Sequence, residues 1–293
     1  TWAGFAGAGG IIGLFVSAAI IDNATWPWVF ALPIALAAIS FVLTIAFVPH
    51  SVEHTEAGFD VAGSILSAVA VGGLVLAFHE GPEQGWNAAI TVAALAAGLI
   101  GAAAFVAVEL RRDHPLLDVR IFAIRGLAAG SINLFVVFAV MFSLFLVLVQ
   151  YLQAVLGYSA LGAASGLLPM AIMMMPLSTI APTIAERIGF RRTLVTGMLL
   201  MSAGLFTFAT LADPDGGYLT VLPGILILGA GVGLSMSPST AAITASLPEE
   251  KQGVASALND TVREMGGAVG IALIGSVLNY AYQANIEPAT SAL

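Results

Sequence analysis

Apolar stretches of about 20 residues recur along nearly the whole chain, and this repetition constrains the fold more than any other feature. At about 1.5 Å per residue, each stretch is long enough to cross a hydrocarbon core about 30 Å thick as a helix. A membrane β-barrel is disfavoured, because its strands are about ten residues long and alternate in polarity. The sequence therefore predicts nine transmembrane helices, at 3–21, 28–48, 61–80, 88–109, 127–149, 161–184, 193–212, 219–245 and 254–280.

The composition agrees with residence in a lipid bilayer, because only 9% of the residues are charged, against about a quarter in soluble domains. A net charge of −8 argues against a nucleic-acid partner. The absence of cysteine excludes disulfides and thiolate metal sites. No metal site and no cofactor is expected. The spans contain no nucleophile paired with a base, so the sequence does not suggest an enzyme.

Basic residues fall on one side of the predicted helices. Alternate breaks between the spans hold eight of the nine Lys and Arg residues, and the other breaks hold none. Cytoplasmic loops are enriched in Lys and Arg, so the basic side is predicted to be cytoplasmic. This places the N-terminus of the chain inside and its C-terminus outside. The eight residues are Arg111, Arg112, Arg120, Arg125, Arg187, Arg191, Arg192 and Lys251.

Several motifs resemble known transporters in their order and spacing. The stretch "APTIAERIGFRRTLVTG" is similar to the loop motif of the major facilitator superfamily. The stretches "HEGPEQGW", "VQYLQAVLGYSALGAASGLLP" and "GVASALNDTVREMGGAVGIALIG" resemble its 14-span drug:proton antiporter family. The resemblance implies an all-α helical bundle in which this chain is a fragment, running from the fifth to the thirteenth of fourteen spans.

The resemblance also implies a division into three segments. Residues 1–48 would end the N-terminal six-helix half, 49–110 would form two extra central helices, and 111–293 would form the C-terminal half without its last helix. In the fifth span, Gly13 fits the family's antiporter motif, but Leu14 stands where proline is expected. Ser17 and Ala18 replace the glycines of that motif, which puts antiport in question.

The function implied is proton-coupled efflux of drugs or other amphipathic compounds by alternating access, in the bacterial cytoplasmic membrane. The expected partners are an amphipathic small molecule, protons and the lipid bilayer. Export of one natural product or siderophore, or facilitation without proton coupling, stays an alternative, as does a non-transporting scaffold. The membrane-embedded acid of the family's first span would lie outside this chain, so the fragment is not expected to transport alone.

The short charged turn is predicted to be a cytoplasmic gate. In the superfamily such a turn joins the cytoplasmic ends of neighbouring helices, through charge pairing and through arginines near helix C-termini, where the dipole is negative. A plain topological anchor is the alternative. The turn comprises Glu186, Arg187, Gly189, Arg191 and Arg192.

Arg263 lies inside the last predicted span, where a charged side chain costs about 2.5–3.5 kcal/mol on insertion scales. Asn259 and Asp260 lie one turn earlier on nearly the same helix face. These three residues are predicted either to line the inward cavity or to form a local ion pair, with the arginine extending to the cytoplasm.

Further cavity candidates are polar or flexible side chains within the spans. Asn133 lies among phenylalanines and is predicted to face a cavity, with an interhelical hydrogen bond as the alternative. Met170 and Met174, on a proline-containing span, are flexible enough to repack around ligands, with ordinary packing as the alternative.

Glycines are predicted to allow close helix packing in lipid. The stretch "GAGVGLSMSP" is not a dinucleotide-binding motif, because no strand precedes it. The predicted packing glycines are Gly9, Gly10, Gly13, Gly229, Gly231, Gly233, Gly266, Gly267 and Gly270.

Overall fold

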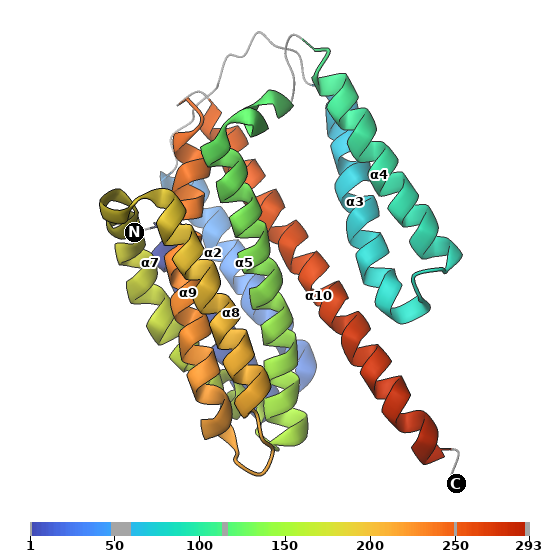
Figure 1. The fold of residues 1–293 in the computed structure, drawn as a ribbon, viewed down its shortest axis with the longest axis vertical. Coiled ribbons are helices and arrows are strands. Elements are labelled where there is room, and N and C mark those ends of the chain that lie inside the picture. The colour runs from blue at the N-terminus through green and yellow to red at the C-terminus, as the bar shows by residue number, and fades with distance from the viewer. Residues whose placement is uncertain (1, 48–59, 113–116, 249–250, 291–293) are drawn as a thin grey trace. The chain divides into compact units, whose positions relative to one another are not determined.

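The computed structural model describes residues 2–47, 60–112, 117–248 and 251–290, with side chains described from Gly13 to Tyr282 within those ranges (Figure 1). The described chain is a succession of α-helices joined by short turns, which confirms the all-α prediction. The long helices are α1 (Trp2–Asn23), α2 (Ala31–Phe47), α3 (Val61–Gln84), α4 (Ala89–Glu109), α5 (Arg125–Gln150), α7 (Leu168–Ile188), α8 (Phe190–Leu211), α9 (Tyr218–Ala245) and α10 (Gln252–Thr290). Short helices are η1 (Trp26–Phe30), η2 (Val119–Ala123), η3 (Tyr151–Val155) and α6 (Ala160–Gly166).

Eight helical segments of the described chain are long and apolar enough to cross a membrane. They match eight of the nine predicted spans closely, the largest difference being that α10 continues beyond residue 280 to Thr290. The remaining predicted span corresponds to α1, of which the part with described side chains, Gly13–Asn23, is apolar.

Three turns are shorter than the sequence suggested, and each contains a glycine with a positive φ. Gly85 and Gly189 have φ values of 95° and Gly157 has a φ of 71°, in the region that side chains with a Cβ rarely adopt. The predicted break at 150–160 is therefore wrong in its extent, since the π-helical turn η3 prolongs α5 to Val155. Likewise α3 continues through Pro82 to Gln84 before Gly85 ends it.

The chain folds into two compact units, each built from separate stretches of sequence. The first comprises residues 1–56 and 148–237, and the second comprises 57–147 and 238–293. These units do not follow the three predicted segments, whose boundaries stay a prediction.

In the first unit, α9 packs on α7 and α8 through glycines. A Cβ on Gly229 or Gly233 would lie 2.6 Å from the carbonyl oxygen of Met170 or Met174 in α7. A Cβ on Gly231, which lies on another face of α9, would lie 2.6 Å from the carbonyl oxygen of Gly197 in α8. The helix backbones therefore touch at these crossings, as small residues allow in membrane bundles.

In the second unit, α3 and α4 form an antiparallel hairpin (Figure 1). A Cβ on Gly73 would lie 2.6 Å from the backbone nitrogen of Gly98, and one on Gly101 would lie 2.9 Å from that of Ala70. Helix α10 packs on α5 in the same way, because Gly266 and Gly270 meet the carbonyl oxygens of Phe135 and Ala139.

A buried polar cluster fixes the open end of the α3–α4 hairpin. Asp60 accepts a hydrogen bond of 2.8 Å from the backbone of Gly63 and so caps α3. Its Oδ1 also lies 3.0 Å from Nη1 of Arg112. At the end of α4, buried Glu109 accepts a 3.2 Å hydrogen bond from the backbone of Leu117. Sequence analysis missed this cluster, because Asp60 is 49 positions from Glu109 and 52 from Arg112 in the sequence.

Candidate functional site

The predicted gating turn is a single residue, Gly189, with its charged residues on the adjoining helix ends. Glu186 and Arg187 belong to the last turn of α7, whereas Arg191 and Arg192 belong to the first turn of α8. All four side chains are exposed. No ion pair joins them to another residue of the described chain, so the pairing expected of a gate stays a prediction. Arg187 alone has the favourable position at a helix C-terminus.

Arg263 is held between α10 and α5. The carbon of its guanidinium group lies 4.5 Å from the centroid of the Phe138 ring, within the range of a cation–π interaction. Its Nη1 also lies 3.6 Å from Oδ1 of Asp260, one helical turn earlier. The side chain is 23% exposed, so the arginine packs against a neighbouring helix as well as forming the local ion pair.

The polar atoms around Arg263 are incompletely satisfied. Asn259 is 8% exposed, and its Oδ1 is buried with no hydrogen-bond partner in the part of the chain that the structure describes. The same holds for Nε of Arg263. Buried polar atoms without partners are costly, so this site is suited to receive a water or a hydrogen-bonding group of a ligand. Asp260, in contrast, is exposed.

Asn133 lies at an interhelical contact rather than in a cavity of the described chain. It is 3% exposed and its Nδ2 donates a 2.7 Å hydrogen bond to Oγ of Ser239, between α5 and the end of α9. This arrangement is the alternative that the sequence left open, and a role in substrate binding stays a prediction.

The two methionines lie at the glycine crossing of α7 with α9. Met170 is 3% exposed and Met174 is half-buried. Their backbones, not only their side chains, make the contact with Gly229 and Gly233. Repacking around a ligand therefore stays a prediction for both.

The predicted packing glycines differ in their surroundings. Gly267 faces the ring of Phe142, which a Cβ would approach to 3.3 Å. Close contacts with a neighbouring helix, given above, are made by Gly229, Gly231, Gly233, Gly266 and Gly270. Gly13 is the exception, because a Cβ there would meet no described atom within 4 Å. Close packing at Gly13 stays a prediction. Gly9 and Gly10 belong to α1 but lie outside the residues whose surroundings are described.

Asp22, which sequence analysis did not single out, joins α1 to α6. Its two carboxylate oxygens accept hydrogen bonds from the backbone nitrogens of Ala160 and Leu161, at 3.2 and 2.9 Å. The bond from Leu161 lowers the pKa of Asp22, against an opposing effect of burial and with help from Ser159 and Ala160. The sequence gave no signal for this contact, because Asp22 lies 138 positions before Ala160, at the start of the helix that it caps.

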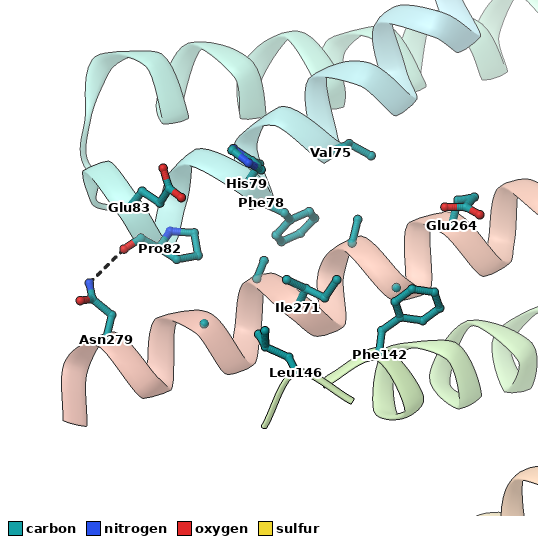
Figure 2. Close-up of a pocket in the computed structure, with 14 residues that line it drawn as sticks. Val75, Phe78, His79, Pro82, Glu83, Phe142, Leu146, Glu264, Ile271 and Asn279 are labelled. Atoms are coloured by element: carbon teal, nitrogen blue, oxygen red, sulfur yellow. Dashed lines mark hydrogen bonds between the residues drawn. The ribbon is translucent and has the colours of Figure 1, made fainter. Parts of the chain in front are cut away.

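A cleft of about 650 Å³ lies between α3, α5 and α10, and we call it the α3–α10 cleft (Figure 2). Its outer limit is set where the two helices are joined, because Asn279 donates a 3.0 Å hydrogen bond to the carbonyl oxygen of Pro82. Most of its lining is apolar. The residues that define it are Phe78 and Glu83 of α3, Phe142 and Leu146 of α5, and Glu264 and Ile271 of α10.

Glu264 is the acid that sequence analysis overlooked beside Arg263. Successive helical residues point about 100° apart. Arg263 lies over Phe138 of α5, whereas Glu264 is part of the lining of the cleft (Figure 2). The signal was available, because an ionisable residue inside a predicted span is by default a candidate for function.

Comparison with known proteins gives a family and several relatives. The family model described as Major Facilitator Superfamily matches residues 1–271. Multidrug resistance protein Stp of Mycobacterium tuberculosis is 29% identical over 287 residues, which are 98% of this chain and 53% of that protein.

Two further relatives are similar over almost all of this chain. Multidrug efflux pump LfrA of Mycolicibacterium smegmatis is 29% identical over 98% of this chain and 56% of its own length. The tetracenomycin C resistance and export protein of Streptomyces glaucescens is 32% identical over 94% of this chain and 52% of its own length. The chain thus spans about half the length of the curated relatives it matches.

Proposed function

The chain belongs to the Major Facilitator Superfamily, and on this premise we propose that it is the larger part of a transporter that exports amphipathic compounds. The transporter works by alternating access in the bacterial cytoplasmic membrane and couples export to the entry of protons. The resistance and efflux functions named for Stp and LfrA support this proposal.

The observation that carries the proposal is the placement of Arg263. Its guanidinium lies over Phe138 of α5, about 16 Å from the start of α10 at ~1.5 Å per residue. A cation at this depth is retained at a cost of a few kcal/mol and is typical of an ion or substrate pathway. The buried, unsatisfied oxygen of Asn259 beside it supports a site that binds a polar group of a ligand.

Two further features suit a transporter that rocks between two states. Asp22 links α1, from the predicted first half, to α6 of the predicted second half through two backbone hydrogen bonds that can be broken and remade. At the other end of the spans, the charged residues around Gly189 are proposed to hold helix ends together on the cytoplasmic side. The orientation itself rests on the distribution of Lys and Arg.

The proposal is tested by the efflux of ethidium from cells that express the complete transporter of which this chain is proposed to be a part. We expect efflux that a protonophore abolishes, and a loss of about tenfold or more in Arg263→Gln at equal protein abundance. The matched control is Arg120→Gln, because Arg120 precedes α5 and its side chain donates only to the backbone carbonyl of Leu110 in the described chain. Efflux that persists without a proton gradient would contradict the coupling, and no efflux of any compound would contradict export.

A second candidate is the export of one natural product. The departures at Leu14, Ser17 and Ala18 from the antiporter motif favour it, as does the export function named for the tetracenomycin C relative. A panel of chemically unrelated compounds separates the two, because a dedicated exporter protects cells from one scaffold only.

A further inference from the structure

Three polar atoms of α5 and α10 are buried without hydrogen bonds. They are Oγ of Ser131, Oδ1 of Asn259 and Nε of Arg263, and none has a partner in the part of the chain that the structure describes. Ser131 is 5% exposed and Asn259 is 8% exposed. Native proteins leave few buried polar atoms unsatisfied, so each of these three is expected to bind something.

The packing of α5 on α10 determines which of their residues lie opposite each other. A Cβ on Gly266 would meet the carbonyl oxygen of Phe135, and a Cβ on Gly270 would meet that of Ala139. A step of four residues along α10 thus corresponds to a step of four residues along α5. The two helices therefore run in the same direction, in a defined register.

This register places Ser131 between Asn259 and Arg263. Ser131 lies one helical turn before the first of these contacts, so it is level with residue 262 of α10. Asn259 and Arg263 are within one turn of that residue, on either side. Asn259 also shares a helix face with Gly266, seven residues later, which touches α5.

Ser131 lies on the face of α5 that meets α10. It precedes Phe138 by seven residues and Phe142 by eleven, and residues with this spacing share one helix face. Phe138 contacts the guanidinium group of Arg263, and the ring of Phe142 lies against Gly267. The three unsatisfied polar atoms therefore converge between the two helices.

The place where they converge is inside the membrane spans. Ser131 and Asn259 are six and seven residues from the starts of the apolar segments Arg125–Val155 and Gln252–Tyr282, which is about 10 Å at ~1.5 Å per residue. Lipid provides no hydrogen bonds, so polar atoms here must be satisfied within the protein. A buried water in a protein makes about three hydrogen bonds to such atoms, and here there are three.

The donors and acceptors select a neutral group. The Nε–H of Arg263 needs an acceptor, Oδ1 of Asn259 needs a donor, and the hydroxyl of Ser131 can serve as either. A carboxylate has no proton to donate to Asn259. An ammonium group has no lone pair to accept from Arg263, and the two positive charges repel each other. A hydroxyl group donates one hydrogen bond and accepts two, which matches the three atoms.

We propose that Ser131, Asn259 and Arg263 bind one hydroxyl group between α5 and α10, supplied by a water molecule or by an exported compound. Ser131 is then a binding residue of the same site as Arg263, contributed by the neighbouring helix. The compound as a source rests on the proposed function, whereas the water does not.

The site is tested with a thiol at Ser131, in the complete transporter freed of any cysteine outside this chain, which has none. Ser131→Cys should react with methyl methanethiosulfonate about tenfold faster than Val137→Cys, because the reactive form is the thiolate, which apolar surroundings suppress. Val137→Cys is the matched control, since Val137 is fully buried on another face of α5.

The same thiol tests whether Asn259 shares the site. Asn259→Leu should slow the reaction of Ser131→Cys about fivefold, because it removes an acceptor that holds the hydroxyl group. The control is Thr261→Ala, since Thr261 donates to a carbonyl of its own helix. A reaction that Asn259→Leu leaves unchanged contradicts a shared site.

The source of the hydroxyl group is tested with two probes of nearly the same shape. A hydrogen bond can be donated by 2-naphthol but only accepted by 2-methoxynaphthalene. Binding to the complete transporter in lipid nanodiscs is measured by fluorescence and corrected for partition into nanodiscs without protein. A compound that supplies the hydroxyl should bind about fivefold more tightly as 2-naphthol, and Ser131→Ala should remove this preference. Ser143→Ala, on another face of α5, should keep it.

The outcomes separate the site from the proposed function. A Ser131→Cys thiol no more reactive than that of Val137→Cys overturns the site and leaves export intact. With a reactive thiol, a preference for 2-naphthol that Ser131→Ala removes assigns the hydroxyl to the compound. Equal binding of the two probes, or a preference that Ser131→Ala leaves intact, assigns it to water. A reactive thiol in a transporter that moves no compound supports the site and contradicts export.

Discussion

Arg263 of α10 lies over the ring of Phe138 of α5, with its guanidinium carbon 4.5 Å from the ring centroid. This contact joins two helices that are far apart in sequence at the position where their backbones touch through Gly266 and Gly270. The arginine is thus part of the packing of the second unit as well as a candidate for coupling.

A double-mutant cycle between Arg263→Met and Phe138→Leu should give a coupling free energy of about 0.5–2 kcal/mol in the stability of the protein in detergent, since cation–π pairs fall in that range. The control pairs Arg263→Met with Phe78→Leu, because Phe78 packs on Trp86 instead. Additive effects in the Arg263–Phe138 cycle would contradict the contact.

Substitution of Asp22 should release the start of α6. The expected result of Asp22→Ala is faster hydrogen exchange at the amides of Ala160 and Leu161, which then lose their acceptors. Asp22→Asn keeps one oxygen acceptor and should give an intermediate rate. Exchange at the two amides that is unchanged in Asp22→Ala would show that the cap does not form.

The same contact should depend on pH in one direction. Because the hydrogen bond from Leu161 lowers the pKa of Asp22, the folded state holds the proton more weakly than the unfolded state does. The stabilisation is therefore complete above the unfolded pKa of about 4 and is lost as the pH falls below it. Protection of the two amides should fall in the wild type as the pH is lowered from about 5 to about 3, and this fall should be absent in Asp22→Ala.

A methyl group at the α7–α9 crossing should be destabilising. Gly229→Ala and Gly233→Ala each place a Cβ 2.6 Å from a backbone oxygen of α7, and overpacking of this kind costs about 1–3 kcal/mol. Gly13→Ala is the matched control, since its Cβ meets open space among the described residues. Thermal unfolding in detergent measures all three, and equal stabilities would contradict the close approach of α7 and α9.

Removal of the Asn133–Ser239 hydrogen bond should have a small effect. Interhelical hydrogen bonds in membrane proteins average about 0.6 kcal/mol, so Ser239→Ala should lower stability by about that amount. Thr207→Ala is the control, because Thr207 bonds only within its own helix. A change in the range of exported compounds in Asn133→Leu, with stability intact, would instead favour the cavity role.

The orientation can be measured with single cysteines in a chain that has none of its own. Asp118→Cys lies in the basic set of loops and Asp215→Cys in the set without Lys or Arg. An impermeant maleimide applied outside intact cells should label the second and not the first. The reverse pattern would place the basic loops outside.

The helices of this fold could be predicted because hydrophobic length alone sets a membrane span. The predicted span at 61–80 and the helix Val61–Gln84 share their first residue for this reason. The ends were predicted less well, because proline and charge suggested a break near Pro82, where the helix in fact continues to Gln84.

The cleft could not be predicted, because its position depends on which helices touch. In lipid, hydrophobicity does not select partners, and shape and small residues do. The pattern of apolar stretches that predicted the helices therefore could not predict that α3 packs against α10. Arg263 was found because a single basic residue inside a span is conspicuous, whereas Glu264 beside it was overlooked.

The one-residue connection at Gly189 has a mechanical consequence. Consecutive Cα atoms are about 3.8 Å apart, so Ile188 and Phe190 stay tethered in any state of the protein. Helices α7 and α8 thus share a pivot at this end, and a tilt of one helix displaces the adjoining end of the other. Arg187, Arg191 and Arg192 therefore stay close together at this end of the two helices.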